Sequence, residues 1–114
     1  MKGVRELNLE LGMPSAAEAV ERLRRDMAST RQLRQPVMKI IHGYGSSGRG
    51  GKIRTAVRRH LREELTQGRV KAVIHGEDFS IFSETTLLAF RLCPALREDR
   101  DLERSNGGVT FLVL

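Results

Sequence analysis

The residues with the clearest chemical potential form a glycine-rich segment that directly follows a short apolar run, 37–41. Residues 42–52 include five glycines, two serines and two cations. Glycine allows positive φ and lets a ligand approach the main chain, and the free N–H groups at the start of a following helix favour an anion. We therefore predict that this segment binds phosphate. The predicted phosphate-binding residues are Gly43, Tyr44, Gly45, Ser46, Ser47, Gly48, Arg49, Gly50, Gly51 and Lys52, with Arg54 and Arg58 in the following helix.

Two familiar phosphate-binding motifs fit this segment only in part. Residues 43–48 match G-x-G-x-x-G between a strand and a helix, but no acidic residue ends the next strand and the chain lacks a second mononucleotide-binding half. The Walker A pattern fails because Ser46 replaces its first glycine and Ile53 its serine or threonine. A flexible connector is the other interpretation of these glycines, and the loop chemistry favours phosphate or another polyanion.

Charge is distributed unevenly along the chain. The net charge is +6; residues 1–76 carry 16 basic and 7 acidic side chains, a net +9, whereas residues 77–114 carry 4 and 7, a net −3. Arg54, Arg58 and Arg62 recur every four residues and share one face of the expected helix. An ordinary solvated face would look the same, but continuity with the glycine-rich segment favours a track along a nucleic-acid backbone. We therefore predict DNA or RNA as the partner, with Tyr44 able to stack on a base.

Three further side chains are candidates for catalysis or metal binding. His42 suits a general acid/base or a donor to phosphate, because imidazole titrates near neutral pH. It equally suits a structural histidine that holds the loop through a backbone hydrogen bond. Glu10 lies near the end of one expected strand and His75 directly follows another, so that with His42 they would provide a two-histidine, one-carboxylate site. A divalent metal ion is therefore a candidate cofactor.

Hydrophobic periodicity predicts one α/β domain over residues 1–114. Strands are expected at 4–11, 37–41, 70–74 and 109–114, and helices from 16 to about 28–33, at 52–66 and at 84–92. Ser15 and Glu18 form a capping-box pattern, and Gly68 is expected to end the second helix. The last strand is so apolar that it should be central or covered on both faces. The core side of the second helix is expected to consist of Ile53, Ala56, Val57, His60, Leu61 and Leu65.

The remaining composition bears on the cellular setting. A single cysteine, Cys93, cannot form an internal disulfide and suits a reducing compartment. No apolar run approaches the ~20 residues that a membrane helix needs. We therefore expect a cytoplasmic protein.

The order of these motifs resembles the Smr (small MutS-related) domain family, and within it a compact stand-alone Smr-like subgroup. The family's central segment reads His-Gly-x-Gly, a short glycine loop, and then Leu or Ile before Arg at a helix start. This chain has His42-Gly43-Tyr44-Gly45 and Ile53-Arg54 at those places. The family ends on Gly-Gly and an apolar strand, as residues 107–113 do here.

The resemblance implies a two-layer α/β sandwich, βαβαβ(α)β, with a mostly parallel four-stranded sheet like that of the C-terminal domain of translation initiation factor three. It also implies partners among branched or nicked DNA, RNA and the ribosome. The family's first motif, Leu-Asp-x-His, is implicated in nuclease activity, and this chain has Leu7-Asn8-Leu9-Glu10 instead. We therefore expect a nucleic-acid-binding domain without strong catalysis, with weak DNA or RNA nicking by His42 and Glu10 as the alternative.

Overall fold

The computed structural model describes residues 1–44 and 49–114, and for Arg49 and Gly50 it describes the backbone alone. Four strands and three α-helices alternate along the chain, with two short 3₁₀ helices, η1 and η2, around α3. The strands are β1 (Val4–Asn8), β2 (Val37–Ile41), β3 (Ala72–His75) and β4 (Val109–Val113). The helices are α1 (Ala16–Gln32), α2 (Arg49–Thr66), η1 (Gly76–Asp78), α3 (Glu84–Leu92) and η2 (Pro94–Glu98).

The strands form one mixed sheet in the order β1-β2-β4-β3. β1 and β2 pair in parallel, whereas β4 is antiparallel to both β2 and β3. Three strands therefore run in one direction, but β4 lies between β2 and β3, so that only the β1–β2 pair is parallel and the sheet is mixed rather than mostly parallel as the resemblance implied. All five residues of β4 are buried, which confirms its predicted central position.

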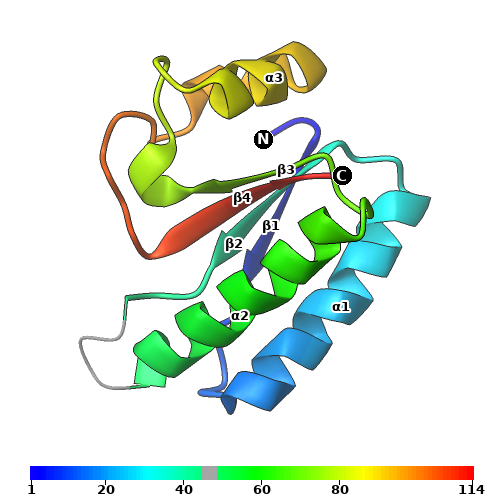
Figure 1. The fold of residues 1–114 in the computed structure, drawn as a ribbon, viewed down its shortest axis with the longest axis vertical. Helices are drawn as coiled ribbons and strands as arrows, with labels where there is room; N and C mark the ends of the chain where they lie inside the picture. Colours follow the sequence, from blue (N-terminus) through cyan, green and yellow to red (C-terminus); the bar gives the residue numbers. More distant parts are fainter. Residues whose placement is uncertain (45–48) are drawn as a thin grey trace.

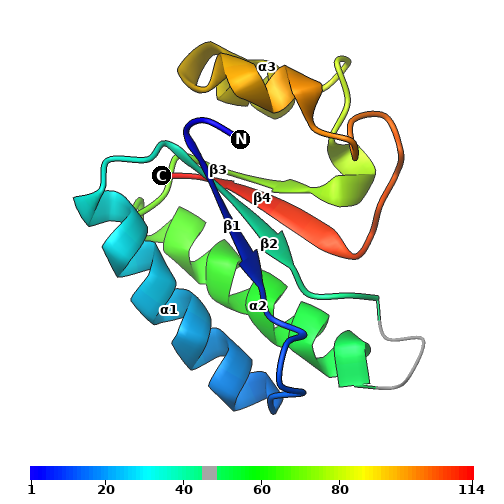
Figure 2. The ribbon, with the colours of Figure 1, turned by 180° about the vertical axis from the view of Figure 1, so that it is seen from behind.

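Helices α1 and α2 lie side by side on one face of the sheet, and α3 lies on the other face (Figures 1 and 2). Leu23 and Met27 of α1 and Val57 and Leu61 of α2 are fully or almost fully buried in one core cluster. Phe79, Phe90 and Phe111 belong to a second cluster, beneath α3. The fold class is confirmed as a sandwich of α1 and α2 on a four-stranded sheet, with α3 adding cover on the opposite face.

Local signals in the sequence set several of these boundaries. The Ser15 hydroxyl accepts from the Glu18 amide and the Glu18 carboxylate accepts from the Ser15 amide, so the predicted capping box starts α1. β1 ends at Asn8 rather than Leu11, because the Asn8 side chain accepts from the Glu10 amide and turns the chain. β3 begins at Ala72 rather than Val70.

Helix α2 differs from the prediction at both its start and its inner face. It begins at Arg49, three residues before the expected Lys52, so Gly50 and Gly51 lie in its first turn. Leu65, expected in the core, is 42% exposed, whereas Glu64 is buried. The chain turns back at Gly68 (φ 72°), and the Arg69 guanidinium binds the Glu64 carboxylate, which satisfies that buried charge. None of the helices in the described residues is long and apolar enough to cross a membrane.

Candidate nucleic-acid-binding site

The predicted site residues that the structure describes lie where β1, β2 and β3 end, beside the start of α2. Glu10 follows β1, His42 follows β2 and His75 ends β3. A Cβ atom at Gly43 (φ 74°) would collide with the Glu10 carboxylate, so these two residues are in close contact. Gly45, Ser46, Ser47 and Gly48 lie outside the described residues. Gly51 and Lys52 belong to the first turn of α2.

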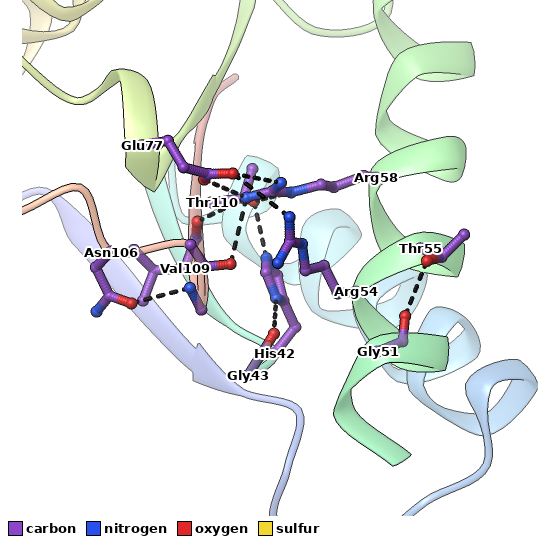
Figure 3. Close-up of polar contacts among 12 residues, drawn as sticks. His42, Gly43, Gly51, Arg54, Thr55, Arg58, Glu77, Asn106, Val109 and Thr110 are labelled. Atoms are coloured by element: carbon purple, nitrogen blue, oxygen red, sulfur yellow. Dashed lines mark hydrogen bonds and ion pairs between the residues drawn. The ribbon is translucent and has the colours of Figure 1, made fainter. Parts of the chain in front are cut away.

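His42 is fully buried and both of its ring nitrogens are occupied (Figure 3). Nδ1 lies 2.8 Å from the Gly43 carbonyl oxygen, and Nε2 lies 2.9 Å from the Thr110 hydroxyl. Because a carbonyl only accepts, Nδ1 carries the proton, and Nε2 of the neutral ring accepts from Thr110. Burial, with further contributions from Arg58 and Arg54, lowers the pKa of His42 to about 4, so the ring is neutral at physiological pH. This geometry favours the structural interpretation of His42.

Arg58 and Arg54 converge on Glu77, a residue that no sequence motif marked (Figure 3). Arg58 Nη1 and Nη2 donate to the two Glu77 carboxylate oxygens at 3.0 and 2.7 Å, and Arg54 Nη2 lies 3.5 Å away. The Arg58 hydrogen bonds are the largest cause of a Glu77 pKa lowered to about 2. Arg58, predicted to contact phosphate, is therefore mostly buried and held by the protein itself, while Arg54 stays about one-third exposed.

Thr110 connects this ion pair to His42. Arg58 Nε donates to the Thr110 hydroxyl at 3.3 Å, and that hydroxyl donates to His42 Nε2. In register, Thr110 pairs with Ile40 of β2 and with His75 of β3. Thr110 is the only polar side chain in β4, which was a usable signal in the sequence. No comparable sequence signal marks Glu77, because its arginine partners lie 19 or more residues away.

A second polar network holds the turn at residues 106–108 against the predicted loop. The Gly108 carbonyl accepts from the amides of His42 and Gly43, both at 3.0 Å. Asn106 accepts from the Gly108 amide and donates to Asp101 at 2.9 Å. Tyr44 is 60% exposed, and its ring lies against Gly108, where a Cβ would be 2.9 Å from Cε1. The start of the loop is therefore fixed by contacts from the far end of the chain.

Asp101 in turn contacts a lysine buried within the sheet. Lys39 Nζ lies 2.7 Å from Asp101 and 2.9 and 3.1 Å from the two oxygens of Asp99. All three side chains are at most 9% exposed. Burial alone would lower the pKa of Lys39, but its hydrogen bonds to Asp101 and Asp99 outweigh burial and raise that pKa. Lys39 therefore stays charged and links β2 to the segment before the 106–108 turn.

Among the side chains of α2 that the structure describes, three cations are exposed and without an ion-pair partner. Lys52, Arg59 and Arg62 are exposed, and within residues 1–44 and 51–114 none of them forms an ion pair. Lys52 and Arg59 line a shallow groove of about 550 Å³ between the start of α1 and the first half of α2, together with Ala16, Gly51, Thr55 and Ala56. The first turn of α2 carries no acidic residue, so the positive end of its dipole is not offset there.

The metal site suggested by Glu10, His42 and His75 does not form. In the part of the chain that the structure describes, no group of three or more His, Cys, Asp or Glu side chains is arranged to hold a metal ion. His42 also has no free lone pair, since Thr110 occupies Nε2. Among the described residues, this region therefore presents the exposed cations Lys52, Arg59 and Arg62 but no metal centre of this type.

Comparisons with known proteins agree on one family. The model of the Smr domain matches residues 9–80. The crystal structure of the Smr domain of Thermus thermophilus MutS2 is similar in fold, with a TM-score of 0.59, 21% sequence identity and 96% coverage of each chain. A comparison with curated proteins finds no match. The chain therefore belongs to the Smr domain family, which is known for nucleic-acid binding and nicking.

Proposed function

We propose that this protein binds nucleic acid by gripping backbone phosphates with the start and outer face of α2 and the glycine-rich segment before it. The observation that carries the proposal is the pair Lys52 and Arg59, exposed beside one groove and without an ion-pair partner among the described residues. Exposed, uncompensated cations in a row are the electrostatic signature of phosphate-backbone binding.

The backbone of this region adds to the attraction for phosphate. The first four N–H groups of a helix have no intrahelical acceptor, and the dipole makes that end positive. In α2 this end coincides with Gly51 and Lys52 and carries no acidic side chain. Residues 43–52 as a whole are proposed as the phosphate-binding loop, and the exposed ring of Tyr44 is proposed to stack on a base. DNA, RNA, branched DNA and ribosomal RNA all present this backbone chemistry.

We infer a positioning role for His42 rather than a catalytic one. A general acid/base must exchange its proton with a reacting group within hydrogen-bond reach. In His42 the Nδ1 proton is directed to Gly43 and Nε2 is taken by Thr110, and the ring is fully buried. Glu10, the other candidate, contacts Gly43 and supplies a carboxylate where the family motif has an imidazole. Binding without strong turnover is the function that this geometry supports.

Charge reversal at Lys52 and Arg59 tests the proposal. The double variant Lys52→Glu/Arg59→Glu is expected to weaken binding to a short duplex by about tenfold or more, or about 1.4 kcal/mol, because two phosphate contacts become repulsive. Fluorescence anisotropy at fixed salt measures this change. The matched control Lys71→Glu/Arg91→Glu makes the same change in net charge elsewhere on exposed residues. Equal losses in both double variants would contradict a localised site.

Removing the carboxylate of Glu77 is expected to have the opposite effect. Glu77→Gln leaves Arg54 and Arg58 without their anion, so nucleic-acid affinity should rise by about 0.5–1 kcal/mol, or roughly two- to fivefold at low salt. The control Glu63→Gln adds the same charge to the exposed side of α2 but frees no arginine. An affinity that does not rise in Glu77→Gln, measured on protein whose circular dichroism is unchanged, would show that these arginines lie outside the interface.

A further inference from the structure

A cavity of about 260 Å³, partly lined by the exposed Arg62 of α2, lies between α2, β3 and the start of α3. β3 is an edge strand of the sheet, with α2 on one face and α3 on the other (Figure 1). Val73 and His75 are half-buried and alternate with Ala72 and Ile74, whose side chains belong to the core beneath α3. The side chains of Val73 and His75 therefore face the α2 side, whereas Ile74 and Thr85 line the cavity from the α3 side.

The lining of this cavity combines apolar and polar side chains. Leu65 and Val73 supply apolar surface, and Leu65 is 42% exposed although it was expected in the core. Arg62 and His75 supply polar groups, and no ion pair or hydrogen bond of either side chain is found among the described residues. Thr85, in the first turn of α3, forms part of the opposite wall.

The neutral ring of His75 can both donate and accept a hydrogen bond in this cavity. Burial, followed by the charge of Arg58, lowers the pKa of His75, so at physiological pH the ring has one donor and one acceptor nitrogen. Such a ring suits the mixed donors and acceptors of a nucleobase edge. It suits a bare phosphate less well, and the nearby Asp78 and Glu77 carboxylates oppose a small anion.

The size of the cavity limits the ligand. Pockets for drug-sized molecules measure about 300–1,000 Å³, so this cavity suits a single flat ring system. A base within a paired, stacked duplex cannot enter, whereas an unpaired base can turn out of the strand. Arg62 lines the cavity and is exposed, so its guanidinium group is available to a phosphate beside a bound base.

We propose that this cavity receives the base of one unpaired nucleotide while α2 holds the adjoining backbone. The proposal rests on the backbone binding proposed above and adds a preference to it. The protein distinguishes a nucleic acid that contains an unpaired nucleotide from one that is fully paired. The apolar side chains that line the cavity hold the ring, and His75 and Thr85 contact its edge.

The test compares a fully paired duplex with the same duplex carrying one extra, unpaired nucleotide, in DNA and RNA series, by fluorescence anisotropy. The wild type is expected to bind the bulged duplex of at least one series about fivefold more tightly. Thr85→Trp, which fills the cavity from its wall, should reduce this preference to within twofold and leave the paired duplex unaffected. His75→Ala should weaken the preference in the same direction. Ala28→Trp adds the same ring to an exposed position on α1 and should change nothing.

The possible failures are distinguishable. Equal affinity of the wild type for paired and bulged duplexes in both series overturns the base-binding proposal and leaves the backbone proposal intact. An unchanged preference in both Thr85→Trp and His75→Ala, with each variant folded by circular dichroism, also overturns it. Failure of the wild type to bind any of the duplexes overturns the proposed function itself.

Discussion

Replacing Lys39 by alanine is expected to lower the free energy of unfolding by about 3–5 kcal/mol. The ammonium group lies within 3.1 Å of Asp99 and Asp101, and all three side chains are almost completely buried. Without it, two carboxylates remain inside the protein with no countercharge. Urea denaturation followed by circular dichroism measures the loss.

Two further variants separate the loss of countercharge from the loss of packing. Lys39→Met keeps the aliphatic volume and should be almost as destabilised as Lys39→Ala. Adding Asp99→Asn and Asp101→Asn to Lys39→Met removes the uncompensated charge and should restore a large part of the stability. Lys71→Ala, at an exposed lysine beside β3, should have little effect. A Lys39→Ala variant as stable as Lys71→Ala would contradict the described network.

Acidification from pH 6.5 to pH 4 is expected to destabilise the protein by about 3 kcal/mol through His42 alone. Burial lowers the pKa of this histidine to about 4, so in this range the unfolded chain binds a proton that the folded protein does not. Stability is therefore fully present above pH 6.5 and declines as the pH falls towards 4. Urea denaturation at pH 7, 5.5 and 4 measures the trend.

His42→Gln isolates this contribution, since the variant has no titrating group at the position. It should be less stable at pH 7, because it loses the bonds to Gly43 and Thr110, but its stability should depend less on pH. His75→Gln is the matched comparison: the pKa of His75 is also lowered by burial, in the same direction. An identical pH dependence in the wild type and His42→Gln would contradict a buried, neutral His42.

The parts of the fold that follow from local chemistry were predictable from the sequence. The capping box formed by Ser15 and Glu18 is a local signal for the start of a helix, and α1 begins directly after Ser15. The strongly apolar segment 109–114 predicted a strand that is central or covered on both faces, and β4 lies between two neighbours and is buried throughout. Hydrophobic periodicity also located β2 correctly at both ends.

The parts that depend on distant partners were not predictable. The four-residue spacing of the α2 arginines predicted that Arg58 lies on an exposed face. Instead, Arg58 contacts Glu77 and Thr110, 19 and 52 residues further on, and these contacts keep it out of solvent. Glu64 is buried, and Leu65 is not, because Arg69 folds back over the end of α2. His42 has the residue type of a catalyst, and only the positions of Gly43 and Thr110 show that both nitrogens are occupied. Residue type and spacing predicted the row of cations on α2, but tertiary contacts determine which of these cations remain exposed.

The salt dependence of binding is the sharpest test of the claim that uncompensated cations on α2 grip phosphates. Log affinity should fall linearly with log salt concentration, by about 0.9 per neutralised phosphate on a duplex and about 0.7 on a single strand. The slope of Lys52→Glu/Arg59→Glu should be shallower than that of the wild type by about two phosphates, or about 1.8 on a duplex. A wild-type affinity independent of salt, or the same slope in both proteins, would contradict the claim.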